Sequence, residues 1–84
     1  MNKLSILIPT YDRADECERI NNWIAKNKKK FNDVIFIVHE NSARSPYKFD
    51  SADLYLFNHF NISNAATLTL VNQCESEFFF TINR

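Results

Sequence analysis

The sequence predicts an α/β protein of three layers, with helices on both faces of a mostly parallel four-stranded sheet. Two observations lead to this fold class. The segments expected to be strands are nearly continuous in apolar residues, which is typical of strands covered on both faces. Helical or long connections separate these segments, so we expect right-handed crossovers instead of hairpins. The chain has 84 residues, 45% of them apolar and 24% charged, which suits one folded domain.

The first strand and the first helix are expected in the N-terminal part of the chain. Leu4–Ile8 is apolar apart from Ser5, and Pro9 is expected to end this strand. Asp12 can cap the following helix, because its carboxylate can accept a hydrogen bond from a free backbone N–H of the first turn. Apolar side chains then recur at helical spacing and are expected to lie on the sheet: Cys17, Ile20, Trp23 and Ile24.

The remaining expected elements are two strands, a helix and a last strand: Val34–Val38, Leu54–Phe57, Ala65–Cys74 and Phe78–Ile82. The strand at Val34–Val38 is rich in β-branched residues and leads into a polar loop at His39–Ser42. Residues 43–51 show no regular period and are expected to be a connection. Asn61 or Ser63 is a candidate cap for the second helix.

Charge and cysteine content exclude several classes of function. Ten basic and ten acidic side chains cancel, so no overall field exists to attract nucleic acid or an anionic membrane. The lysines at 26 and 28–30 fall where the first helix is expected to end, which suits the negative end of the helix dipole. Cys17 and Cys74 have no metal-ligand spacing and are expected to be reduced core residues.

Two absences narrow the function further. The sequence contains no glycine, so neither a P-loop nor a dinucleotide-binding fingerprint is present, because both depend on glycine. The apolar run before Pro9 is too short for a signal sequence or a transmembrane span. We therefore expect a cytoplasmic protein without a transmembrane segment.

Four segments, taken together, resemble the first half of a family 2 glycosyltransferase in their order and spacing. These segments are KLSILIPTYDRADE, DVIFIVHENS, NISNAATLTLVNQC and SEFFFTINR. The most specific piece is Pro9-Thr10-Tyr11-Asp12-Arg13, which stands where the family has Pro-Thr-Tyr-Asn-Arg. The resemblance covers essentially all of this chain but less than half of such an enzyme. It implies one truncated domain at 1–84, the Rossmann-like half of a GT-A fold, with strand order 3-2-1-4.

The resemblance also implies a nucleotide-binding site. Pro9, Thr10, Tyr11 and Arg13 follow the first strand, and Glu40 follows the second. Ligands of open α/β sheets bind beyond the carboxyl ends of the strands, which is where these residues are expected to lie. By resemblance, Tyr11 lies against the base of a uridine diphosphate sugar, Thr10 and Arg13 contact the uridine or a phosphate, and Glu40 accepts a hydrogen bond from the base.

The sequence departs from the family where the metal is bound. The family places an Asp-x-Asp type motif after its fourth strand to hold Mg²⁺ or Mn²⁺, whereas this chain has Asn83 and Arg84 there. Thr67 and Leu68 stand roughly where the family has an Arg-Asn pair. The acceptor-binding half also lies outside the resemblance. We therefore assign no catalytic residue and expect the chain to be inactive alone.

Other interpretations of the same residues remain open. Tyr11 can also be interpreted as a residue that packs at the rim, Arg13 as a partner of Asp12 or Glu16, and Glu40 as a solvated loop carboxylate. Isolated histidines such as His39 are more often structural than catalytic. The alternative function is a non-catalytic interaction module or a remnant on the same fold. An apolar edge at residues 78–82 predicts a homo-oligomer that covers it.

Overall fold

The computed structural model describes residues 4–11, 14–41, 47–59, 70–74, 76 and 78–81, with Tyr11 described by its backbone alone. The elements in chain order are β1 (Leu4–Tyr11), α1 (Ala14–Lys28), β2 (Val34–Asn41), β3 (Leu54–Phe57) and β4 (Phe78–Thr81). The four strands form one sheet in the order β3-β2-β1-β4, and each adjacent pair is parallel. The expected α/β class, the parallel sheet and the strand order 3-2-1-4 are confirmed.

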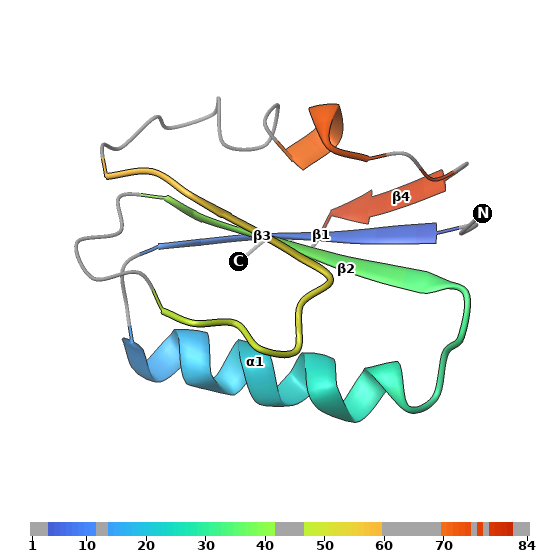
Figure 1. Ribbon diagram of the computed structural model, residues 1–84, viewed down its shortest axis with the longest axis horizontal. Helices are drawn as coiled ribbons and strands as arrows, with labels where there is room; N and C mark the ends of the chain where they lie inside the picture. The colour runs from blue at the N-terminus through green and yellow to red at the C-terminus, as the bar shows by residue number, and fades with distance from the viewer. Residues whose placement is uncertain are drawn as a thin grey trace.

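Side chains of the two inner strands are buried on both faces of the sheet, since successive side chains of a strand point to opposite sides. On one face, Ile8, Phe36 and Val38 pack with α1. On the other face, Leu7 and Ile37 pack against Leu70. Figure 1 shows α1 below the sheet and the helical residues 70–72 above it. This two-sided burial explains why β1 and β2 are almost continuously apolar.

Helix α1 follows from charge placement and apolar spacing. Its first turn carries acidic side chains and its last turn basic ones, which favours the helix dipole at both ends. Cys17 and Ile24 are fully buried against the sheet. Trp23 was expected on the same face, but it is 42% exposed, and its ring makes a T-shaped contact with that of Phe36, with ring centroids 5.9 Å apart. The helical period places Trp23 at the margin of the buried stripe.

Strands β1 and β2 run three residues further than expected. Pro9 does not end β1, because the strand continues in register with β2 through Thr10 and Tyr11. β4 pairs with β1 only from Leu4 to Leu7, so no described residue pairs with that side of β1 at Pro9, and proline is tolerated best where one side of a strand is unpaired. The polar residues at 39–41, expected in a loop, likewise belong to β2.

The two outer strands are offset along the sheet. β4 pairs with the first four residues of β1, Leu4–Leu7. β3 pairs with the four residues of β2 that precede Asn41, from Ile37 to Glu40. β4 therefore lies toward the amino ends of the inner strands, and β3 lies toward their carboxyl ends.

A set of polar contacts joins the connection before β3 to α1 and β2. The carboxylate of Asp53 accepts a hydrogen bond from the Phe36 N–H at 2.8 Å and pairs with the Lys28 ammonium at 2.9 Å. Lys28 also donates to the Ser51 carbonyl, and the Ser51 N–H donates to Asn21 Oδ1. These contacts fix the entry into β3 on the α1 side of the sheet.

Strand β4 is much more exposed than the other strands. Its expected bounds are confirmed for Phe78–Thr81, and Ile82 lies outside the described residues. The side chains of Phe78, Phe79 and Phe80 are 62%, 51% and 61% exposed. Within the described part of the chain, no helix is long and apolar enough to cross a membrane.

Candidate functional site

The carboxyl ends of β1 and β2 lie side by side, as the sequence predicts. Thr10 is the register partner of Glu40, and Tyr11 is the partner of Asn41. The structure thus brings Pro9, Thr10, the Tyr11 backbone and Glu40 to one rim. Arg13, Asn83 and the other expected residues at 12, 67, 68 and 84 lie outside the described part of the chain.

Strand alternation divides this rim between the two faces of the sheet. Glu40 follows Val38 on the α1 face, where its Oε2 lies 3.6 Å from the Cys17 thiol. Ile37 belongs to the opposite face, so His39 and Asn41 lie there as well. The rim therefore carries the Glu40 carboxylate and its donors on the α1 face, and a neutral polar cluster on the other face.

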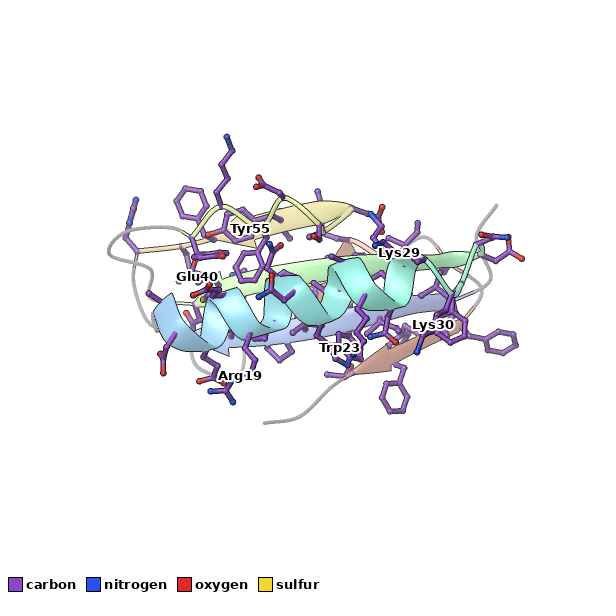
Figure 2. The ribbon with its side chains drawn as sticks, turned by 90° about the horizontal axis from the view of Figure 1, so that it is seen from below. Arg19, Trp23, Lys29, Lys30, Glu40 and Tyr55 are labelled. Atoms are coloured by element: carbon purple, nitrogen blue, oxygen red, sulfur yellow. The ribbon has the colours of Figure 1, made fainter. Side chains whose placement is uncertain are left out.

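Glu40 lies at the centre of the α1-face cluster and is 1% exposed. Its Oε1 accepts hydrogen bonds from the Tyr47 N–H at 3.0 Å and from the Tyr55 hydroxyl. Its Oε2 accepts the weaker hydrogen bond from the Cys17 thiol. Figure 2 shows Glu40 and Tyr55 close together beside the N-terminal half of α1. Interpreting Glu40 as a solvated loop carboxylate is therefore wrong.

The burial of Glu40 limits how a nucleotide could use it. A carboxylate has four lone-pair sites, and three protein donors already occupy part of them. A base N–H would have to share Oε2 with the Cys17 thiol or replace the Tyr55 hydroxyl. In the described conformation, Glu40 joins β2 to the segment before β3.

A row of aromatic rings extends from this cluster along β3. Its members are Tyr47, Phe49, Tyr55 and Phe57, whose consecutive ring centroids are 4.9, 5.2 and 5.7 Å apart. Desolvation, together with the nearby acids Glu18 and Asp50, raises the pKa of the Tyr47 phenol, so this group stays neutral at physiological pH. The row is an apolar wall beside the carboxylate.

The opposite face of the rim is built from His39, Asn41 and Asn58. His39 is 2% exposed and Asn41 is 2% exposed. The Asn58 side-chain amide donates to Asn41 Oδ1 at 2.9 Å. Burial lowers the pKa of His39, with a hydrogen bond to Asn58 opposing that shift, and its Nδ1 has no hydrogen-bond partner among the described residues. The imidazole is neutral at physiological pH.

Several residues of the rim were missed by sequence reasoning. Tyr47 and Tyr55 hold Glu40, and Asn58 holds Asn41, yet none of the three belongs to the segments that carry the resemblance. Alternation along Leu54–Phe57 could have placed Tyr55 on the same face as Glu40, given the strand order. No comparable signal marks Tyr47, because its contact is made by a backbone N–H in an irregular segment.

The described residues offer no cluster of three or more His, Cys, Asp or Glu side chains that could hold a metal ion. The chemistry of residues 83 and 84 also disagrees with the family's cation, because a hard divalent ion prefers carboxylate oxygens and arginine repels it. We therefore derive no step through a metal.

A cavity of about 240 Å³ lies elsewhere, on the sheet face opposite α1. It is lined by Ser5, Ile35, Ile37, Asp53, Leu54 and Gln73. Ser5 and Ile35 are the second residues of β1 and β2, so the cavity lies toward the amino ends of the strands. It does not coincide with the expected nucleotide site.

Comparison with known proteins identifies no relative: no family model, no curated protein and no solved structure matches this chain.

Proposed function

We propose that this chain is a nucleotide-binding domain of the family 2 glycosyltransferase type, the three-layer, Rossmann-like half of a GT-A fold. Its ligand is uridine diphosphate or a uridine diphosphate sugar. The observation that supports this proposal best is the parallel register of β1 and β2, which sets Thr10 beside Glu40 and Tyr11 beside Asn41. The motif Pro9–Arg13 thus begins at a strand end of the kind that binds nucleotides in α/β sheets.

The topology adds a second line of support. The connection that follows β1 runs through α1 on one face, whereas residues 70–74, which precede β4, pack on the other face. Strand order therefore reverses at β1, between β2 and β4. A crevice at the carboxyl end of such a strand is the usual ligand position in doubly wound sheets. Tyr11 is the last residue of β1, and Arg13 follows it two residues later in the sequence.

The proposed contacts follow the resemblance, with one adjustment for Glu40. Tyr11 lies against the base, Arg13 pairs with a phosphate, and Pro9 and Thr10 shape the strand end beneath them. Glu40 is held by three protein donors, so we assign it mainly to positioning the Tyr47–Phe57 wall beside the nucleotide. No catalytic residue is assigned, and binding without sugar transfer is the proposed activity of these residues.

Titration calorimetry with UDP tests the proposal. We expect saturable binding that manganese does not strengthen, because an amide and a guanidinium stand where the family has metal-binding acids. Tyr11→Ala and Arg13→Ala should each weaken binding at least tenfold. Phe31→Ala and Lys30→Ala are matched controls, because both side chains are exposed and follow the C-terminal end of α1, and Figure 2 shows Lys30 at the end of the molecule far from Glu40. Absence of binding at millimolar UDP would contradict the proposal.

The second candidate is a non-catalytic interaction module on the same sheet. Two observations favour it: the Glu40 carboxylate is already satisfied inside the protein, and β4 exposes three phenylalanines. Under this function, Tyr11→Ala should leave partner binding unchanged while β4 substitutions abolish it. Tyr11→Ala therefore distinguishes the two candidates: it should weaken UDP binding under the first and leave partner binding unchanged under the second.

A further inference from the structure

We infer that the outer edge of β4 is a self-association surface, on which two copies of this chain pair their β4 strands antiparallel about a two-fold axis. The inference rests on β4 alone and is independent of nucleotide binding. It extends the sheet of each copy across the interface.

The edge of β4 carries none of the features that usually protect an edge strand. β4 pairs with β1 on one side, and no described residue pairs with it on the other. Natural edge strands are typically protected by charged side chains, proline or bulges. Phe78–Thr81 contains no charged residue and no proline. Another strand could therefore pair with the backbone N–H and C=O groups on this edge, with which no described strand pairs.

The exposed rings lie on both faces of the sheet. Phe78 and Phe80 are the register partners of Leu4 and Ile6, so they lie on the α1 face, whereas Phe79 is the partner of Ser5 and lies on the opposite face. All three are more than half exposed. A partner docked on one face would leave rings uncovered on the other. A strand added in the plane of the sheet reduces the exposure on both.

A second copy fits this edge because β4 is complementary to itself. A two-fold axis perpendicular to the sheet keeps each side chain on its own face. It sets Phe79 opposite the partner's Phe79 and Phe78 opposite the partner's Phe80. Opposed aromatic pairs stabilise antiparallel strands, and no like charges meet in this register. The formal net charge of zero also removes long-range repulsion between copies.

The exposed area suits a weak dimer. A phenylalanine buries about 150–250 Å² when fully enclosed, so the exposed fractions of the three rings amount to about 350 Å² per copy. Two copies together offer about 700 Å² from these rings, against about 1,600 Å² for a standard interface. We therefore expect a dimer with a dissociation constant in the micromolar range.

Sedimentation equilibrium from low micromolar to several hundred micromolar protein tests the dimer. We expect Phe79→Lys to raise the dissociation constant at least tenfold, because two like charges would meet at the two-fold axis. Phe57→Lys is the matched control, since Phe57 is 46% exposed on the other edge strand, β3. Circular dichroism checks that each variant is folded. If the wild-type protein stays monomeric throughout this range, the inference is overturned, and any partner of the β4 edge is a different chain.

Cysteine cross-linking tests the register and does not depend on the lysine variant. In a Cys74→Ala background, Phe79→Cys should form a disulfide-linked dimer under mild oxidation, while Phe78→Cys should form little, because it faces the partner's Phe80. The native Cys17 is fully buried and can stay. Equal cross-linking by Phe57→Cys, or failure of Phe79→Cys in a folded protein, would overturn the proposed pairing.

Discussion

Glu40 shows how a single buried carboxylate organises the rim. It is nearly inaccessible to solvent and accepts hydrogen bonds from a backbone N–H, a phenol and a thiol. A buried carboxylate is tolerated only when such donors replace its hydration. The three donors come from α1, the 47–53 segment and β3, so Glu40 connects three parts of the chain to β2.

Removing this carboxylate should destabilise the fold. Glu40→Ala leaves the Tyr47 N–H and the Tyr55 hydroxyl without their acceptor, and we expect a loss of about 3 kcal/mol in unfolding free energy. Tyr55→Phe removes one charge-assisted hydrogen bond and should cost about 1.5–3 kcal/mol. Urea unfolding measures both. Glu18→Ala, an exposed control on α1, should change the free energy by less than about 0.5 kcal/mol.

His39 should make stability depend on pH. Burial lowers its pKa below the value of 6.5 that it has when unfolded. Between these two values the unfolded chain binds the proton and the folded chain does not, so stability is full above pH 6.5 and is lost as pH falls below it. The loss cannot exceed about 1.4 kcal/mol per pH unit for one group.

Urea midpoints at pH 7.5, 6.5 and 5.5 test this dependence. His39→Leu should flatten the fall between pH 6.5 and 5.5, whereas His59→Asn, at an exposed position outside the sheet, should keep it. An equal fall in the His39→Leu variant would assign the pH dependence to other groups.

Residue roles were only partly predictable from the sequence. Pro9, Thr10 and Glu40 could be placed at neighbouring strand ends because strand order and hydrophobic pattern fix their register. The burial of Glu40 could not be predicted, since it depends on Tyr47 and Tyr55, which approach through an irregular connection. Whether Tyr11, Arg13 and Glu40 bind a nucleotide stays a prediction.

At the scale of elements, the sequence placed every strand but shortened two of them. Apolar character ends at Ile8 and Val38, so Pro9 and the polar residues after β2 were expected outside the strands. Backbone pairing continues to Tyr11 and Asn41. The side chains of Glu40 and Asn41 can belong to the strand because they find hydrogen-bond partners within the protein. The hydrophobic pattern of a sequence indicates which residues are buried against apolar groups. It therefore does not reveal strand ends that are made of polar residues.

The contact of Asp53 with α1 and β2 gives a prediction at this scale. Asp53→Asn keeps an acceptor for the Phe36 N–H and removes only the ion pair with Lys28, whose groups are about one-third exposed, so it should cost less than about 1 kcal/mol. Asp53→Ala also leaves the Phe36 N–H without its acceptor and should cost about 1–3 kcal/mol.

Thermal and urea unfolding of both Asp53 variants provide the measurement. Asp50→Ala, at an exposed position in the same connection, is the control and should be close to wild type. Equal losses for Asp53→Asn and Asp53→Ala would show that the ion pair, and not the hydrogen bond to β2, fixes the entry into β3.

At the scale of the whole molecule, the fold class was predictable because the pattern is consistent along the chain, whereas the strand order was implied by the resemblance to family 2 glycosyltransferases. Buried-type strands alternate with helical or long connections, and the parallel sheet follows from that alternation. The exposure of β4 was predicted only as an open edge. Its three phenylalanines predict a buried strand, but their side chains are exposed. Aromatic composition alone does not reveal what lies beside a strand.

The offset of the outer strands places the two candidate surfaces at opposite corners of one sheet. β3 borders the carboxyl-end rim, while β4 borders the amino ends of the inner strands. Substitutions that tune assembly at one corner therefore need not disturb recognition at the other. Such a layout lets a small protein change its stoichiometry and its ligand preference by separate mutational routes.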